Sequence, residues 1–478
     1  MTGAGVRITR TPAPASMRRA CRTVSLLAPY LAAAFGALWT SASFAQTHPA
    51  PGSNAMAPYI AKRGDTLYDI AGRYLRDPSD WVTVSRLNHV PTPRRLQPGV
   101  KLLLPVELLR RDHLTARVVA TSGPVEHAFR SGPFTPVSVD MMLTEGDRVR
   151  TGHNGFVTLE LADGSHIGVP QDSTLGIDTL RQTALTGATD RVFDLQEGEL
   201  RTEVTHATKK DDRFQIRSPS VVAGVRGTSF RVRYDRDGAS TTTVEVLDGA
   251  VGVDAASRAP RAPGVPLQAS AQLVTAHYGN LTRDSGAIGA PVPLLPTPAL
   301  LDPAKLQAAK EVAFDIVPQP EAQAWRVQIA RDAGLLALIR ETRVTEPQAS
   351  FGDLPDGSYF VSLSAIDSQG LEGLPQVYAF ERRQFGLAAS AAPRTGTRDY
   401  EFRWFVSRQA DSTRFRFVLA DTADLSHPLI DRTDLEGGEL LVKDLPRGVY
   451  YWTVIAEQFD NGTFYETGSA VRSFTLAY

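Results

Sequence analysis

The chain has 478 residues, of which 42% are hydrophobic, and it carries 51 Lys and Arg against 52 Asp and Glu, with one cysteine. This length predicts about three to four globular domains, with disorder confined to the linkers. The near-neutral charge argues against nucleic acid as a partner, and a single cysteine excludes a disulfide framework.

Residues 1–45 have the pattern of an export signal. Five arginines precede the apolar run from Val24 to Trp39, and no acidic residue occurs before Ala45. Small residues at Ser43 and Ala45 predict cleavage after Ala45. The apolar run is short for a membrane span. The pair Arg18-Arg19 lacks the flanking residues of a twin-arginine signal, so we interpret it as part of an ordinary basic region.

Removal of this signal changes the expected composition of the chain. Residues 1–45 contain Cys21 and five arginines, so 46 basic residues remain against 52 acidic ones, a formal charge of −6. A cysteine-free, mildly acidic chain has no disulfides, no thiol nucleophile and no affinity for nucleic acid. The export signal therefore predicts a periplasmic protein without an integral membrane span after signal removal.

Residues 59–105 predict a strand, two helices and a second strand. Tyr59 begins the first strand, and the turn Gly64-Asp65-Thr66 exposes backbone amides before a helix that Asp65 or Thr66 caps. Ser79 is the expected cap of a second helix that ends at Asn88. The apolar residues of the first helix recur at three- and four-residue spacing and predict one packed stripe: Leu67, Ile70, Ala71, Tyr74 and Leu75.

This segment resembles a LysM module, with predicted bounds 56–108. The resemblance rests on Gly64-Asp65-Thr66-Leu67, Ile70-Ala71, Leu87-Asn88, and Leu96-Gln97-Pro98-Gly99 followed by Leu102 and Leu104-Pro105. It implies a βααβ fold that binds N-acetylglucosamine glycans such as peptidoglycan and chitin, in a groove between residues 64–67 and 88–93. The implied glycan-binding residues are Gly64, Asp65, Thr66, Leu67, Asn88, His89, Val90 and Pro91.

Two alternatives stay open for these residues. Loop backbone can supply the hydrogen-bonding groups that an N-acetyl amide needs, but Asp65 and Thr66 can equally serve only as helix caps, and Asn88 only as a helix terminator. The loop also departs from the family in having Pro91 and Pro93, where a Gly or Asp is more usual. Two prolines stiffen one wall of the groove.

Residues 114–257 predict an all-β domain. In residues 156–161, Val157, Leu159 and Leu161 alternate with polar residues, and Asp163-Gly164 predicts a hairpin. Asp248-Gly249 predicts a second hairpin of the same kind. A further alternating run places Phe230, Val232 and Tyr234 on the inner face and Arg231 and Arg233 on the outer one, which we expect to be solvated.

Three blocks in this domain resemble the FecR domain, a periplasmic β-rich module: residues 145–152, 195–200 and 222–230. In the founding iron-citrate regulators, a cytoplasmic segment controls a sigma factor. Only 23 residues precede the apolar run here, too few to fold as a domain. The resemblance therefore implies fold and compartment more than signalling. Within the third block we expect Gly224 and Gly227 at a bend and Arg226 bonded to loop carbonyls, in preference to a ligand loop.

Residues 258–308 are rich in Pro, Ala and Gly and predict a stiff linker, although residues 272–278 also fit the preceding domain. Two related halves follow, at 309–386 and 397–478. Trp325 corresponds to Phe415, and Tyr359 in Leu-Pro-Asp-Gly-Ser-Tyr corresponds to Tyr450. The halves resemble immunoglobulin-like or fibronectin type III modules. The predicted fold is thus multidomain and mainly β.

Nothing in the sequence indicates catalysis, a metal site or a cofactor. The nine histidines have no metal-ligand spacing, and no GxSxG elbow or P-loop occurs. The paired carboxylates Asp211-Asp212 lie beside two lysines in an expected surface turn. We predict a non-enzymatic exported envelope protein that binds peptidoglycan strands and presents its β domains to an unidentified envelope protein. The alternatives are a periplasmic signal-receiving component of FecR type and a wall hydrolase.

Overall fold

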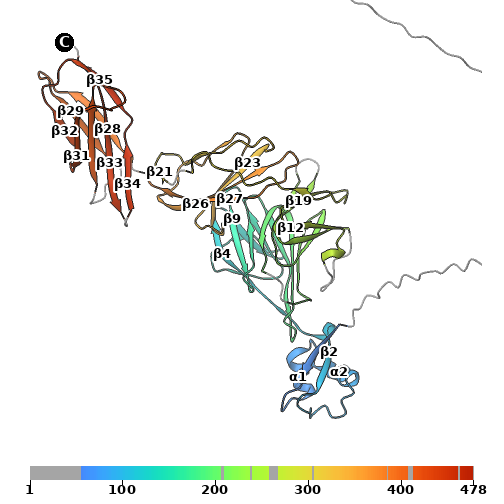
Figure 1. Ribbon diagram of the computed structural model, residues 1–478. Helices are drawn as coiled ribbons and strands as arrows, with labels where there is room; N and C mark the ends of the chain where they lie inside the picture. The colour runs from blue at the N-terminus through green and yellow to red at the C-terminus, as the bar shows by residue number, and fades with distance from the viewer. Residues whose placement is uncertain are drawn as a thin grey trace, which may run out of the picture. The chain divides into compact units, whose positions relative to one another are not determined.

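The computed structural model describes residues 55–205, 209–236, 240–257, 267–303, 306–384, 386–406, 413–460 and 463–476. The predicted export signal lies outside these residues. The described residues form a small βααβ module followed by three larger all-β units, coloured in chain order in Figure 1. The predicted mainly-β, multidomain fold is confirmed.

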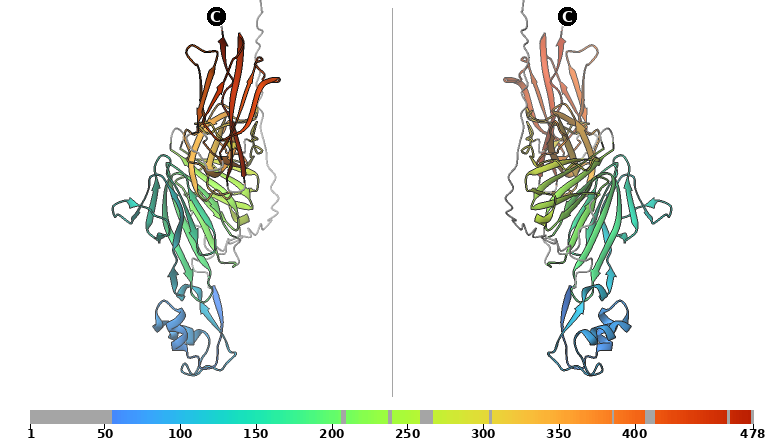
Figure 2. Two further views of the ribbon diagram at one scale, coloured as in Figure 1. Left: turned by 90° about the vertical axis from the view of Figure 1, so that its left-hand side faces the viewer. Right: turned by 90° about the vertical axis from the view of Figure 1, so that its right-hand side faces the viewer.

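The βααβ module pairs strand β1 (Met56–Ile60) with strand β2 (Lys101–Pro105) in antiparallel register. Helix α1 (Leu67–Tyr74), the 3-10 helix η1 (Pro78–Asp80) and helix α2 (Trp81–Leu87) connect them, and both α-helices lie on the same side of the strand pair (Figure 2). A short 3-10 helix, η2 (Val106–Leu108), follows.

The predicted apolar stripe of α1 forms the core of this module. Leu67, Ile70, Ala71 and Leu75 are at most 2% exposed, and they pack with Leu102 and Leu104 of β2. The cap of the second helical segment differs from the prediction of Ser79. The Asp77 carboxylate, and not Ser79, caps η1 by accepting the Ser79 amide at 2.8 Å. Pro78 takes the first helical position, where its missing N–H costs nothing, so the cap moves to the residue before it.

The second unit is a closed sheet of eighteen strands. Its strands are β3 (Arg111–His113), β4 (Ala116–Ser122), β5 (Val125–Phe129), β6 (Thr135–Pro136), β7 (Met142–Leu143), β8 (Asp147–Thr151), β9 (Phe156–Leu161), β10 (His166–Val169), β11 (Thr174–Thr183), β12 (Thr189–Glu203), β13 (Arg213–Arg217), β14 (Val221–Val225), β15 (Ser229–Asp235), β16 (Thr241–Asp248), β17 (Ala250–Ala255), β18 (Gln272–Thr275), β19 (Tyr278–Arg283) and β20 (Val292–Pro293), with the 3-10 helix η3 (Leu267–Ala269) before β18.

One of the two predicted hairpins is correct. Strands β9 and β10 pair across Asp163-Gly164. Strands β16 and β17 flank Asp248-Gly249, but β16 pairs with β15 and β19 while β17 pairs with β14 and β18. The turn therefore joins two strands that pair with different neighbours and not with each other. The prediction was wrong because alternation beside a tight turn is the same whether the two strands pair with each other or with more distant strands.

The segment 258–308 is not simply the predicted linker. Strand β18 pairs with β17, β19 pairs with β16, and β20 pairs with β19. Val274, Asn280 and Thr282 on these strands are fully buried. The strands complete the closed sheet through partners far away in sequence, which local Pro and Ala content does not reveal.

The third unit, called here the first sandwich, has two sheets. A five-stranded sheet has the order β21-β27-β26-β23-β24, and β22 pairs with β25. The bounds are β21 (Leu306–Gln307), β22 (Ala313–Asp315), β23 (Ala324–Ala330), β24 (Leu338–Val344), β25 (Gln348–Ser350), β26 (Gly357–Ile366) and β27 (Gln376–Arg382).

The last unit, the second sandwich, packs the sheet β28-β29-β32 against a sheet built on β31, β30, β33, β34 and β35. The bounds are β28 (Ala388–Pro393), β29 (Tyr400–Phe405), β30 (Arg414–Ala420), β31 (Pro428–Leu435), β32 (Glu439–Val442), β33 (Gly448–Asp460), β34 (Thr463–Gly468) and β35 (Arg472–Leu476). Because β28 belongs to it, this unit begins before the predicted residue 397.

The predicted correspondence between the two sandwiches is visible in their strand registers. Trp325 lies opposite Ala365, and Phe415 lies opposite Ala456. The Tyr359 hydroxyl donates to the Pro355 carbonyl at 3.0 Å, and the Tyr450 hydroxyl donates to the Pro446 carbonyl at 2.9 Å. The Leu-Pro-x-Gly-x-Tyr segment therefore makes the same corner in both units.

Candidate functional site

The turn before α1 uses both of its polar side chains for its own structure. Thr66 Oγ1 accepts the Asp69 amide at 3.1 Å and is the cap of α1. The Asp65 carboxylate accepts the Tyr59 hydroxyl at 2.6 Å and the Lys62 amide at 2.8 Å. These bonds hold the turn in one conformation. A ligand can then approach the exposed backbone of the turn, at Gly64.

Two hydrogen bonds join this turn to the loop after α2. The Leu67 amide donates to the Pro93 carbonyl at 2.8 Å, and the Leu96 amide donates to the Asp65 carbonyl at 3.3 Å. The two loops that the sequence predicted as groove walls are therefore in direct contact. Together they form one continuous face at the end of the module.

Besides Asp65 and Thr66, three more of the predicted binding residues have structural roles. The Leu67 side chain is 1% exposed, and its amide is bonded to Pro93. The Asn88 amide group donates to the carbonyls of Val84 and Leu103 at 2.8 and 2.9 Å, and its oxygen accepts the Leu103 amide at 2.7 Å. Val90 is half-buried in the core. Asn88 thus links α2 to β2, which matches its interpretation as a structural residue.

Gly64, His89 and Pro91 are the predicted residues that remain accessible. All three are exposed, and a Cβ added to Gly64 would meet no atom within 4 Å. His89 has a positive φ of 52°, which turns the chain directly after Asn88. These residues surround the contact between the two loops, so they are the ones a ligand can touch.

Sequence reasoning missed an aromatic pair beside this face. Tyr68, the second residue of α1, is 41% exposed, and its ring centroid lies 4.7 Å from that of the half-buried Trp81 at the start of α2. The signal was available, because Tyr68 falls on the polar side of the α1 stripe. An aromatic residue there lies outside the core stripe and presents an apolar surface with a polar tip.

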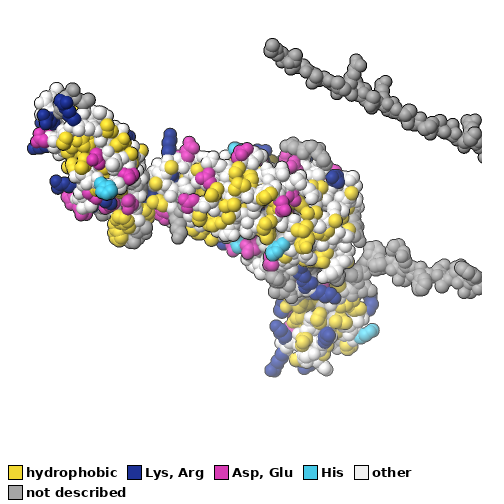
Figure 3. All heavy atoms as spheres, turned by 45° about the horizontal axis from the view of Figure 1, so that its top comes forward, with side chains coloured by type: hydrophobic (Ala, Val, Ile, Leu, Met, Phe, Trp, Pro, Cys, Tyr) yellow, Lys and Arg dark blue, Asp and Glu magenta, His cyan; other side chains and the backbone are white. Residues whose placement is uncertain are grey.

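The electrostatics of the module follow from its burial and hydrogen bonds. Burial and the hydrogen bond to Asp65 raise the pKa of Tyr59 to about 12. The hydrogen bonds from Tyr59 and from the Lys62 amide lower the pKa of Asp65, which stays ionised at neutral pH. Lys and Arg side chains are prominent on the face of this module turned to the viewer in Figure 3.

A second candidate site lies where the first sandwich covers the outer face of the closed sheet; we call this interface the ionic seam. Arg231 on β15 is 3% exposed and contacts the Glu372 carboxylate at 2.6 Å. Arg233 donates to the Gly370 carbonyl at 2.8 Å. The predicted solvated basic face is therefore wrong. The arginines point outward from their own sheet as expected, but a surface more than 130 residues later in the chain buries them.

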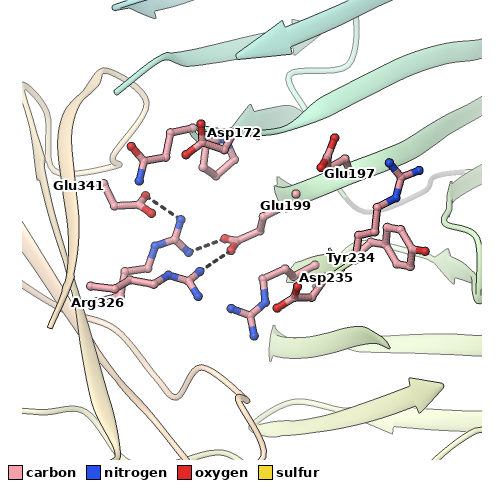
Figure 4. Close-up of a pocket in the computed structure, with 13 residues that line it drawn as sticks. Asp172, Glu197, Glu199, Tyr234, Asp235, Arg326 and Glu341 are labelled. Atoms are coloured by element: carbon pink, nitrogen blue, oxygen red, sulfur yellow. Dashed lines mark hydrogen bonds and ion pairs between the residues drawn. The ribbon is translucent and has the colours of Figure 1, made fainter. Parts of the chain in front are cut away.

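Arg326 on β23 is the centre of the ionic seam. It contacts three carboxylates, those of Glu199, Glu341 and Glu372, the last two at 2.7 and 2.8 Å. Figure 4 shows Arg326 with Glu199 and Glu341. Although burial lowers the pKa of Arg326, the three carboxylates raise it well above its usual value. Burial raises the pKa of Glu199, but the charges of Arg326 and Arg343 lower it by more. The net shift of the Glu199 pKa is therefore downward. Arg326 and Glu199 therefore stay charged at neutral pH.

A cavity of about 340 Å³ opens at one side of the ionic seam, as Figure 4 shows. Residues of both charges line it, among them Asp172, Glu197, Arg233, Arg236 and Arg343. The signs are mixed and several of the groups pair with each other across the contact between the two units, as Arg326 does with Glu199.

Comparison with known proteins identifies the first two units. The family model described as LysM domain matches residues 59–105, and the model described as FecR protein matches residues 147–252. The chain carries a LysM domain followed by a FecR domain. No curated protein matches it.

Solved structures with partial similarity share little sequence with this chain. A putative anti-sigma factor from Parabacteroides distasonis is 17% identical over 30% of this chain and 57% of its own, with a TM-score of 0.23. The fibronectin(III)-like modules of Clostridium thermocellum CbhA are 16% identical over 37% and 90%, with a TM-score of 0.20. Chicken CNTN1 FN1-FN3 is 12% identical over 63% and 97%, with a TM-score of 0.23. The chain thus spans little more than half of the anti-sigma factor.

The third sequence block of the FecR domain, residues 222–230, is part of its core. Val222, Ala223 and Val225 are buried on β14, and Gly224 lies opposite Gly252 of β17. Arg226 is exposed and donates to the Lys209 carbonyl at 3.2 Å. The predicted bend is correct for Gly227, which has a φ of 73°, and the predicted bond of Arg226 to a loop carbonyl is present. The predicted bend is wrong for Gly224, which lies within β14 and pairs with β13 and β17.

Two general features of the described residues concern metals and membranes. No group of three His, Cys, Asp or Glu side chains among them is placed to hold a metal ion. No helix within the same residues combines the length and the apolar character needed to cross a bilayer.

Proposed function

We propose that this protein is a non-enzymatic, exported envelope protein that binds the N-acetylglucosamine glycan of peptidoglycan through its LysM domain. In this proposal it resides in the periplasm and presents its FecR domain and sandwiches to an envelope protein. The observation that carries the proposal is the joined face of the two LysM loops, where the Leu67 amide bonds to the Pro93 carbonyl.

The glycan would contact the backbone around Gly64 and residues 89–92, with Tyr68 at the edge of the face. The side chains of Asp65, Thr66 and Asn88 already bond within the domain, so they would position the backbone and not grip the sugar. A single shallow face of this kind gives weak affinity, because it buries little area against the cost of immobilising the ligand.

A pull-down with purified peptidoglycan tests this proposal. Thr92 is exposed in the second loop, and Thr92→Trp would fill the face while leaving the backbone bonds unchanged. Thr83→Trp, at an exposed site in the first half of α2, is the matched control. We expect Thr92→Trp to stay in the supernatant and Thr83→Trp to sediment like the unchanged protein. Equal sedimentation of all three, with unchanged melting curves, would refute glycan binding at this face.

Export has a separate test. Mass spectrometry of the protein purified from the periplasmic fraction should give a mature chain that begins at Gln46. A chain that keeps residues 1–45 and stays in the cytoplasm would contradict the proposed location.

The alternative is a signal-receiving component of FecR type, which the FecR match favours. Within residues 222–230, Arg226 is the exposed side chain that can be changed without disturbing the core. Loss of a specific transcriptional response in Arg226→Ala cells, with peptidoglycan binding intact, would support this alternative. An unchanged transcript profile would leave the anchoring function as the better account.

A further inference from the structure

One row of residues crosses the outer face of the FecR domain beneath the first sandwich. The strand registers place Thr158 of β9 opposite Gly168 of β10, Gly168 opposite Arg201 of β12, and Arg201 opposite Arg231 of β15. Arg231 in turn lies opposite Glu245 of β16. Arg201 therefore lies between another arginine, Arg231, and a glycine, Gly168.

The charges of the ionic seam leave Arg201 without a counter-ion. Arg231 pairs with Glu372, Arg326 pairs with three carboxylates, and Arg343 pairs with Glu199. Among the described residues, no hydrogen bond or ion pair holds the Arg201 guanidinium. Burial and the neighbouring Arg231 lower the pKa of Arg201 to about 10. Arg201 thus stays cationic at neutral pH in a site that disfavours its charge.

The remaining acid of the row does not supply the missing charge. Glu245 lies beyond Arg231, with one oxygen 3.7 Å from the Arg231 Nε. Burial raises the pKa of Glu245, so the ionised carboxylate is less favoured there than it is in water. Within this row of residues, Arg201 therefore has no carboxylate directly opposite it.

A small cavity of about 50 Å³ lies over Arg201. Its lining includes Thr158, Gly168, Arg201, Glu203 and Ser229 on the sheet and residues 334–336 of the sandwich. The absence of a side chain at Gly168 leaves this space, since an added Cβ would meet no atom closer than 3.6 Å. This volume is several times what one water molecule needs, and it suits a small ion of a few atoms.

The cavity has an approach from solvent. A wider hollow of about 410 Å³ shares His166, Glu203, Ser229 and Gly334 with its lining. Glu203 is exposed and lines both spaces, whereas Asp248 lines only the wider hollow, so acidic groups lie beside Arg201 and along the approach to it. A small anion can be held there, whereas a large or highly charged one meets repulsion at the entrance.

We propose that Arg201 binds a small monocarboxylate or inorganic oxyanion in this cavity, between the FecR domain and the first sandwich. The guanidinium offers paired N–H donors that match the two oxygens of such an ion. The ion would pair with the Arg201 guanidinium between the two units, so its binding would stabilise their contact.

Thermal unfolding of the full chain with its signal removed tests this site. Sodium formate, acetate or sulfate would replace sodium gluconate at constant ionic strength and pH, because gluconate is a carboxylate too large for the cavity. We expect a saturable rise in Tm of a few degrees with formate and acetate, and a response to sulfate only if inorganic oxyanions also enter. Equal melting curves in formate and gluconate would overturn the proposal.

Two variants assign the effect to Arg201. Arg201→Met keeps the bulk of the side chain without its charge and should lose the formate response. Gly168→Asp places a carboxylate directly opposite Arg201, so we expect a higher Tm in gluconate and no further rise with formate. If Arg201→Met does not fold, Gly168→Asp still decides, because a full formate response in that variant contradicts binding at Arg201.

Discussion

The core of the FecR domain and the ionic seam beside it are buried to a similar degree, but by opposite chemistry. The core consists of residues such as Val118, Leu159 and Phe193, each fully buried. The seam buries Arg231, Arg326 and their carboxylate partners almost as completely. Apolar packing is non-directional and drives folding. Charged pairs return little net energy after desolvation, but they fit only one arrangement of partners.

This difference indicates what the seam contributes. An apolar cluster of Phe156, Ala330, Leu335 and Leu338 also lies between the two units. Such a patch alone would tolerate sliding, whereas Arg326 with three carboxylates fixes one register. We therefore interpret the seam as the element that orients the first sandwich on the FecR domain, and the predictions below test that interpretation.

The largest expected effect comes from removing the central cation. Arg326→Met leaves Glu199, Glu341 and Glu372 buried without it, and breaking a buried pair in this way costs about 3–5 kcal/mol. Hydrogen exchange of peptides covering β23 and β12 should show this loss as faster opening of both elements. A loss below about 1 kcal/mol, the usual value of an exposed pair, would mean that water already solvates the seam.

A smaller effect, with a defined pH dependence, is expected for Glu372→Gln. Burial raises the pKa of Glu372, but Arg231 and Arg326 lower it more, and the net direction is strongly down. A carboxyl whose folded pKa is lowered contributes stability above its unfolded pKa of about 4.3, and this contribution is lost as pH falls toward the folded value. At pH 7 the variant should lose about 1.5–3 kcal/mol, the value of hydrogen bonds to a charged group.

The difference between Glu372→Gln and the unchanged protein should therefore shrink as pH falls below about 4.3. Urea unfolding at pH 7, 5 and 3.5, followed by hydrogen exchange of β26 peptides, measures it. Glu245 works in the opposite direction, because burial raises its pKa and its protonation at low pH removes a cost. A constant difference across this range would show that the Glu372 carboxylate is not ionised in the seam.

Local pattern predicted much of the fold. The α1 stripe follows from helical spacing, and the shared corner of the sandwiches follows from Leu-Pro-x-Gly-x-Tyr, because both depend on neighbouring residues. Within the predicted linker, the alternative that residues 272–278 belong to the preceding domain is confirmed by β18, but β19 and β20 were not predicted. The pairing of Val251 with Val274 depends on a sheet edge that the segment itself does not encode.

The candidate sites show the same division. The positions of the two LysM loops could be predicted from the sequence, but the engagement of Asn88 with Leu103, fifteen residues away, could not. The outward direction of Arg231 was predicted correctly from strand alternation. Its burial depends on Glu372, 141 residues later, so no local pattern contains it.

The two sandwiches allow a matched test of whether the seam stiffens its own unit. Tyr359→Phe and Tyr450→Phe remove equivalent hydroxyls that bond to Pro355 and Pro446. Each should cost about 0.5–1.5 kcal/mol, the usual value of one hydrogen bond. Equal losses, measured by hydrogen exchange of β26 and β33, would confine the influence of the seam to the strands it touches. A clearly larger loss for Tyr359→Phe would extend that influence into the sandwich.

The smallest effect is expected where the same chemical pair is exposed. Arg416 on β30 contacts Asp431 on β31 at 2.7 Å, a geometry as close as that of Arg326 with Glu341. The Arg416 side chain is 41% exposed, however, against 2% for Arg326. Solvent screens the exposed pair, so Arg416→Met should cost only about 0–1 kcal/mol.

Salt separates the two pairs further. Raising the ionic strength should remove most of the small Arg416 contribution in urea unfolding and leave the Arg326 contribution nearly unchanged, because a buried pair is screened much less than an exposed one. Equal salt dependence in Arg416→Met and Arg326→Met would contradict the distinction between seam and surface. Since the contact distances match, burial is the variable that this last comparison isolates.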